Sequence, residues 1–145
     1  MIEFKTDAHE KAYHEVLLWV TQLFGESALV NDERPTFRLP IGQAGLSVTV
    51  ETFGDDAACV DFYAWLLEDT VFPTDAHEWA LKVNGQYRFG ALNIQPDGLA
   101  LVEHVALFHG MTKTTFSELA HMIAGTTDEV LLEFGSRFMG GNLVE

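Results

Sequence analysis

The sequence predicts an α+β protein with the element order α-β-β-β-α-β-β-α. Three observations lead to this prediction. The segments at the two ends of the chain repeat their apolar residues every three or four positions, a long group of strand-like runs follows the first segment, and a shorter group precedes the last. With 145 residues the chain has the usual length of one domain, so we expect a single domain over residues 1–145.

The N-terminal segment, residues 6–24, has the pattern of an amphipathic helix with one buried face. Thr6 or Asp7 can cap its first turn, and Gly25 is placed to end it in the left-handed conformation. Residues 27–34 can form a short extended piece, but the polar end NDERP favours a loop. The strands are therefore expected to begin after this loop.

Three antiparallel strands are predicted at residues 36–41, 46–53 and 57–67, because turn-forming GQAG and GDD separate runs rich in β-branched and aromatic residues. A second helix is expected to begin at about residue 74. Two further strands flank a Pro-Asp-Gly turn, which completes a five-stranded sheet.

The C-terminal segment, residues 114–139, restores the helical period, and Gly125 is expected to kink or split this last helix. The apolar periodicities of all these segments predict one shared core. Its expected members are Val16, Val20, Leu23, Val48, Val50, Ile123 and Phe134.

The third predicted strand is apolar on both faces, which is unusual for a strand with one face in water. Helices packed mainly on one side of the sheet would leave the other side uncovered. One set of side chains, either Tyr63, Trp65 and Leu67 or the opposite set of this strand, then lacks cover. We expect the first set, together with Leu81 of the following helix, to contact a partner. The predicted assembly is a homodimer formed around this strand and helix, with a protein or peptide client on neighbouring sheet surface.

The chain is strongly acidic, with 22 Asp and Glu against 8 Lys and Arg and a formal charge of −14 at pH 7. Nucleic acids and anionic membranes need clustered cations on the protein, so we expect neither as a partner. The acidic stretch between Arg38 and Lys82 favours solubility, or alternatively a basic or neutral partner. A signal-peptide core and a bilayer-length apolar run are both missing, which predicts a cytoplasmic protein.

The six histidines do not have the usual spacing of metal ligands. His9 and His14 are five residues apart, about 140° around a helix, and Glu103 and His104 are adjacent in a strand, so they point to opposite faces. We therefore expect no metal and no cofactor. A small-molecule enzyme or metal-binding protein that uses Glu103, His104 and His109 remains the alternative interpretation.

Catalytic signatures are missing as well, since the sequence contains no phosphate-binding loop, dinucleotide fingerprint, HExxH, CxxC or GxSxG motif. The lone cysteine, Cys59, lies in a strand-like run and is interpreted as a core thiol rather than a nucleophile. No catalytic residue is predicted, and the leading interpretation is a protein that is not an enzyme.

Three strings, together with the order of segments, resemble the YbjN-like family of sensory transduction regulators. They are FRLPIGQAGLSVTVETF, WALKVNGQYRFGALNIQPDGLALVEHVAL and FGSRFMGG. The fold of that family is similar to that of the type III secretion chaperones. The resemblance implies a twisted antiparallel sheet with helices packed on it and frequent homodimerisation. It also implies a chaperone-like or regulatory function in which apolar surface holds an extended client, and it assigns no residue a role.

Overall fold

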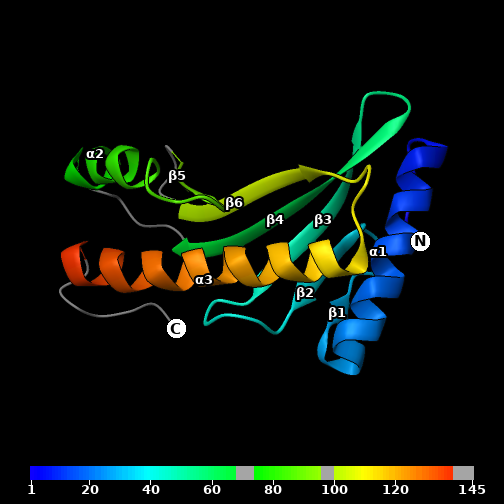
Figure 1. Ribbon diagram of the computed structural model, residues 1–145, viewed down its shortest axis with the longest axis horizontal. Helices are drawn as coiled ribbons and strands as arrows, with labels where there is room; N and C mark the ends of the chain where they lie inside the picture. The colour runs from blue at the N-terminus through cyan, green and yellow to red at the C-terminus, as the bar shows by residue number, and fades with distance from the viewer. Residues whose placement is uncertain (68–73, 96–99, 139–145) are drawn as a thin grey trace.

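The computed structural model describes residues 1–67, 74–95 and 100–138, and in this part the chain is α+β with the predicted order of elements (Figure 1). One antiparallel six-stranded sheet has the strand order β1-β2-β3-β4-β6-β5. The elements are α1 (Asp7–Phe24), β1 (Leu29–Val30), β2 (Thr36–Leu39), β3 (Leu46–Phe53), β4 (Ala57–Leu67), α2 (Thr74–Val83), β5 (Ala91–Ile94), β6 (Ala100–Leu107) and α3 (Lys113–Phe138).

Over the described ranges the sheet has six strands, so the prediction of five was wrong. The additional strand, β1, lies just before the polar NDERP loop, within the possible short extended piece, and it pairs Leu29 with Arg38 and Val30 with Phe37. Two residues are too few for a period-two pattern to appear in the sequence. Only the tertiary pairing with β2 makes this segment a strand.

Helix α1 begins and ends as predicted. The Thr6 side chain accepts a hydrogen bond from the His9 amide, and Gly25 follows the last turn with φ 56° and ψ −134°. This φ is positive as expected, although the ψ differs from that of a left-handed helical residue. The expectation that Leu23 is buried was wrong, because its side chain is 37% exposed and Phe24 packs against the core at this turn instead.

The core lies between the helices and one face of the sheet, called here the inner face. Val48 of β3 is paired with both Phe37 and Phe62, so the three side chains share this face. Phe62 contacts the Phe116 ring of α3 with 5.5 Å between centroids, and Tyr13 of α1 stacks on Phe37 at 5.3 Å. Helices α1 and α3 therefore cover the same side. The predicted core residues Val16, Val20, Val48, Val50, Ile123 and Phe134 are all buried, as expected.

Helix α3 runs without a break from Lys113 to Phe138, so Gly125 does not split it. The two threonines that follow Gly125 are accommodated because their hydroxyl groups donate to the carbonyls four residues earlier, Thr126 to Met122 and Thr127 to Ile123. The apolar residues on both sides of Gly125 can then face the sheet together.

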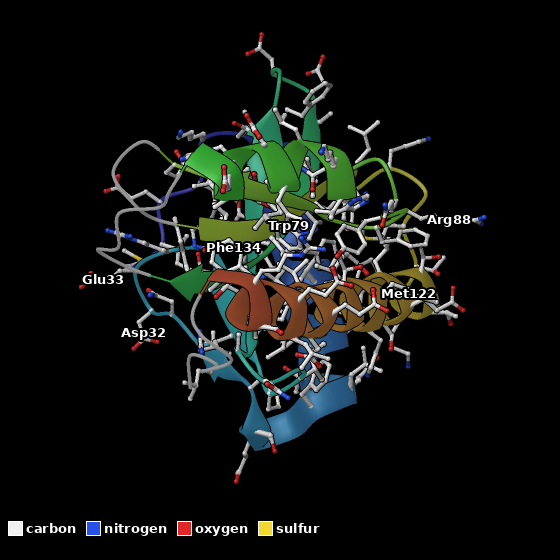
Figure 2. All side chains as sticks on the ribbon, turned by 90° about the vertical axis from the view of Figure 1, so that its left-hand side faces the viewer. Asp32, Glu33, Trp79, Arg88, Met122 and Phe134 are labelled. Carbon is white, nitrogen blue, oxygen red and sulfur yellow. The ribbon has the colours of Figure 1, made fainter. Side chains whose placement is uncertain are left out.

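Helix α2 joins the core from the inner side as well. Trp79 contacts Phe134 of α3 with 5.8 Å between ring centroids, and Figure 2 shows both side chains between the two helices. The buried residues of α2 form one cluster with inner-face residues such as Val102, whereas Leu101, buried on the opposite face, lies outside that cluster. Within the described residues, the helices thus leave the opposite face of the sheet without core packing.

Candidate functional site

The face of the sheet turned away from the helices is the candidate site, and we call it the outer face. The pairing of Tyr63 with both Ser47 and Glu103 puts these side chains on one side of β3, β4 and β6. The residues of the outer face that matter here are Thr49, Glu51, Asp61, Tyr63, Trp65, Glu103, Val105 and Leu107.

Large apolar side chains are exposed on the outer face. Trp65 is 39% exposed, Val105 52% and Leu107 55%, and Phe53 is exposed near the β3–β4 turn. These residues come from three strands rather than from one loop, so the rigid sheet sets their spacing. An apolar group of this kind on a scaffold without its own cover is typical of a protein-binding surface.

Three carboxyl groups lie on a diagonal across the outer face. Asp61 of β4 is paired with Thr49 of β3 and with Val105 of β6. Glu51 lies two residues after Thr49 on β3, and Glu103 lies two residues before Val105 on β6. Both are therefore diagonal neighbours of Asp61, on opposite sides of it. We call Glu51, Asp61 and Glu103 the carboxyl diagonal.

The middle member of the diagonal is buried. Asp61 is only 9% exposed, and its Oδ1 atom has no hydrogen-bond partner among the described residues. The carboxyl groups of Asp61 and Glu103 are within hydrogen-bonding reach of each other, which requires a proton on one of them. Burial, this hydrogen bond and the negative charges of Glu103 and Glu51 raise the pKa of Asp61 from 3.8 to about 8. The Asp61–Glu103 pair therefore holds a proton at neutral pH.

A line of hydroxyl groups borders the carboxyl diagonal. The Thr36 and Thr49 hydroxyl groups are 3.0 Å apart, and the Thr49 hydroxyl is 3.1 Å from the Tyr63 hydroxyl, so hydrogen bonds connect β2, β3 and β4 on the outer face. Tyr63 is held in this line beside its cross-strand neighbour Glu103. The outer face therefore has an ordered polar side next to its exposed apolar residues.

The structure brings together two of the four predicted partner-binding residues. Tyr63 and Trp65 lie side by side on the outer face. Leu81 is 80% exposed on α2, whose buried side belongs to the inner-face core, so it does not continue the surface formed by the other two. The side chain of Leu67 lies outside what the structure describes.

The residues of the alternative interpretation do not converge. Glu103 lies on the outer face, whereas His104 lies on the inner face, where its ring is 6.0 Å from that of Phe89. His109 follows the end of β6 and is exposed. Over the described ranges, no group of three or more His, Cys, Asp or Glu side chains is arranged to hold a metal ion.

Cys59 is buried on the outer face, opposite Glu51 and Leu107. Burial raises the pKa of its thiol, and the charges of Glu51 and Asp61 raise it further. A thiol with a raised pKa is a poor nucleophile, so the site geometry agrees with a structural cysteine.

Apart from the outer face, the structure has a hollow between α2 and the C-terminal part of α3. It has a volume of about 670 Å³, and the Arg137 guanidinium lies over the Trp79 ring at 6.0 Å from its centroid. Its charged lining residues are Asp75, Glu78, Lys82, Glu133 and Arg137. Because acidic and basic side chains both line this hollow, its charge does not indicate whether a ligand would be an anion or a cation. It is therefore a weaker candidate for the functional site than the outer face.

The buried Asp61 carboxyl group and its half-buried neighbour Glu103 were not predicted from the sequence. The signal was present, since Asp61 is the one charged residue within the apolar strand AACVDFYAWLL. A charged residue inside such a strand is rarely buried without a partner. The partner could not be found because Glu103 is 42 positions away and becomes its neighbour only through the pairing of β4 with β6.

Comparison with protein families gives a match over residues 12–136, to the family YbjN, described as "Putative bacterial sensory transduction regulator". The chain belongs to the YbjN family. Comparison with curated proteins gave no match. The family description names a regulator and no enzymatic reaction. In the part of this family member that the structure describes, no helix is both long and apolar enough to cross a membrane.

Proposed function

We propose that this YbjN-family protein is a non-enzymatic regulatory domain that binds a protein or peptide client on the outer face of its sheet. The observation that carries the proposal is the exposure of Trp65, Val105 and Leu107 on a face that receives no core packing from the described helices. Their positions on paired strands give a client a preformed surface. Little ordering of the sheet is then needed on binding.

The energetics favour an apolar client segment. Covering exposed apolar surface contributes about 25 cal/mol per Å², so even partial cover of these three side chains is favourable. Trp65 is the expected anchor, since aromatic residues in partly enclosed positions contribute most to binding at protein interfaces. Tyr63 adds a polar contact beside it, because its hydroxyl belongs to the ordered hydroxyl line.

The family description and the predicted likeness to type III secretion chaperones support the same class of function. A regulator can act by binding a client segment, and a small chaperone also binds its client without catalysing a reaction. The alternative, an enzyme or metal site at Glu103, His104 and His109, has less support because these side chains are divided between two faces and a loop.

Capture of unfolded polypeptide tests the proposal. The client is reduced and carboxamidomethylated ribonuclease A, and binding is measured by surface plasmon resonance. Trp65→Ala is expected to weaken capture by about tenfold, the effect of removing one anchor residue. Leu132→Ala is the control, because Leu132 is also a large exposed apolar residue, 62% exposed against 39% for Trp65, but lies on α3. Equal capture by both variants and the wild type, with Trp65→Ala folded, would reject the outer face as the client surface.

A further inference from the structure

The carboxyl diagonal is placed in the middle of the exposed apolar residues of the outer face. Val105 is directly opposite Asp61, Leu107 lies two residues beyond it on β6, and Trp65 lies beyond Tyr63 on β4. A client segment that covers these apolar side chains must also cover the carboxyl groups. The client must therefore be able to lie against negative charge.

Around the carboxyl diagonal, the part of the chain that the structure describes provides no neutralising cation. Among residues 1–67, 74–95 and 100–138, no Lys or Arg nitrogen lies within 4.0 Å of a carboxylate oxygen, and the ion pair found there joins His14 to Glu10. Arg38 lies on the outer face too, but its guanidinium donates to the Ala44 carbonyl at the end of the sheet near β2. The described part of the chain thus supplies no internal counter-ion for the diagonal.

The carboxyl diagonal lacks a hydrogen-bond donor for one oxygen of Asp61. A carboxyl group that is 9% exposed, with one oxygen lacking a donor, is costly unless a hydrogen-bond donor or an opposite charge compensates it. The proton shared with Glu103 reduces this cost but leaves Oδ1 without a donor. A cation placed on the pair would supply the missing charge.

We infer that the outer face recognises a client segment in which Lys or Arg alternates with apolar residues. The cationic group binds at the Asp61–Glu103 pair, and the apolar neighbours cover Trp65, Val105 and Leu107. This inference rests on the proposed function and specifies the chemistry of the client. Glu51, which is exposed, and Glu103, which is half-buried, form the accessible part of the site. A bidentate guanidinium or an ammonium group suits two neighbouring carboxylates.

A second copy of the chain is a poor occupant of this surface. It would bring its own carboxyl diagonal, and two sets of three acidic groups would then be buried against one another. The formal charge of −14 adds to this repulsion. Charge complementarity therefore favours a basic client over self-association through the outer face.

Binding of the cation is expected to release a proton. The O–H bond of the Asp61–Glu103 pair breaks, the proton passes to the buffer, and the ammonium or guanidinium group takes its place as the hydrogen-bond donor. The titratable groups that face Asp61 are Glu51 from β3, Glu103 from β6, and Cys59 and Tyr63 from its own strand. Of these, Glu103 and Glu51 act on the Asp61 charge most strongly.

Three fluorescein-labelled ten-residue peptides test the inference, in which Val alternates with Lys, with Gln or with Glu. Fluorescence anisotropy at pH 7 is expected to show the Lys peptide binding the wild type at least about tenfold more tightly than the Gln peptide, and the Glu peptide binding most weakly. The double variant Asp61→Asn with Glu103→Gln should lose this preference. Neutralising both carboxyl groups removes the need for a counter-ion, so the variant is expected to fold, as circular dichroism will show.

The matched control is Glu15→Gln with Glu129→Gln, which removes two exposed carboxylates from α1 and α3. The control removes at least as much negative charge at pH 7, because the Asp61–Glu103 pair shares a proton. It should keep the Lys preference to within about twofold. Isothermal titration calorimetry in buffers of different ionisation enthalpy should detect proton release for the wild type and the control, and none for the Asp61 and Glu103 double variant.

The outcomes separate this inference from the proposed function. Equal binding of the Lys and Gln peptides, both weakened by Trp65→Ala, would leave the outer face as a client surface and reject the basic client. Equal losses in the two double variants would assign the attraction to overall charge and also reject the inference. Failure of all three peptides to bind, or no effect of Trp65→Ala on any of them, would reject both.

Discussion

The Asn84 side chain forms two hydrogen bonds with the Leu92 backbone: its Nδ2 atom donates to the Leu92 carbonyl at 2.8 Å, and the Leu92 amide donates to its Oδ1 atom at 2.7 Å. Leu92 belongs to β5, the last strand of the sheet order, so its outward backbone groups would otherwise form an open edge. The amide of Asn84 takes the position of a neighbouring strand. This side chain both joins the end of α2 to the sheet and closes an edge that could pair with another chain.

Asn84→Ala is therefore expected to destabilise the protein by about 1 to 3 kcal/mol, because it leaves two partly buried backbone groups without partners. Urea unfolding followed by circular dichroism measures this change. Asn84→Asp tests the geometry, since it keeps the acceptor for the Leu92 amide but loses the donor to the carbonyl. Stability equal to that of the wild type in both variants would show that solvent replaces the two hydrogen bonds without cost.

The stability of the protein is expected to fall as the pH rises from about 4 to about 8. Folding raises the pKa of Asp61 from 3.8 to about 8, so within this window the folded state holds a proton that the unfolded state has released. The folded state is favoured most below the unfolded pKa, and this advantage is lost as the pH approaches the folded pKa. Urea unfolding at a series of pH values measures the effect.

Asp61→Asn should flatten this pH dependence and raise stability at pH 8, because the amide carries no charge to bury. Asp55→Asn is the control, since Asp55 is exposed in the β3–β4 turn and its removal should leave the slope as in the wild type. An unchanged slope in Asp61→Asn would mean that Asp61 is not the group responsible.

The packing of α3 against α2 depends on Phe134. Its side chain is buried and contacts Trp79, so Phe134→Ala should destabilise by about 3 to 5 kcal/mol through lost burial and a cavity. Leu132→Ala, an exposed position two residues away, should change the free energy of unfolding by less than about 0.5 kcal/mol. Similar values for the two variants in denaturant unfolding would contradict the assignment of this helix face to the core.

Self-association around β4 and α2 remains a prediction. Because Leu81 does not continue the outer face, we narrow the expected interface to one of these two elements. We expect a dimer that uses the exposed side of α2 rather than the carboxyl diagonal. Light scattering during size exclusion should then give twice 16.2 kDa for the wild type and for Asp61→Asn, whereas Leu81→Glu should move the mass towards that of the monomer. A mass of 16.2 kDa for the wild type at high micromolar concentration would exclude the dimer.

Local sequence patterns were enough to predict the order of elements and most of the inner face. Alternation in β3 and the three-to-four step in α1 and α3 are local patterns, so they placed Val16, Val50 and Ile123 in the core without knowledge of which strand lies next to which. The two apolar faces of β4 likewise indicated that one of them would lack helix cover, and strand pairing then showed that this face is the one that carries Trp65. These features depend on residues a few positions apart.

The tertiary structure alone decided the rest. It made β1 a strand, connected Asn84 to Leu92, separated Leu81 from Trp65, and brought Glu51 and Glu103 to the two sides of Asp61. Each of these facts follows from strand pairing or helix placement, which no local apolar period in the sequence reports. In a sheet, a shift of one residue in register moves every side chain to the other face. The neighbours of Asp61, and with them its proton, were therefore beyond the reach of any local pattern.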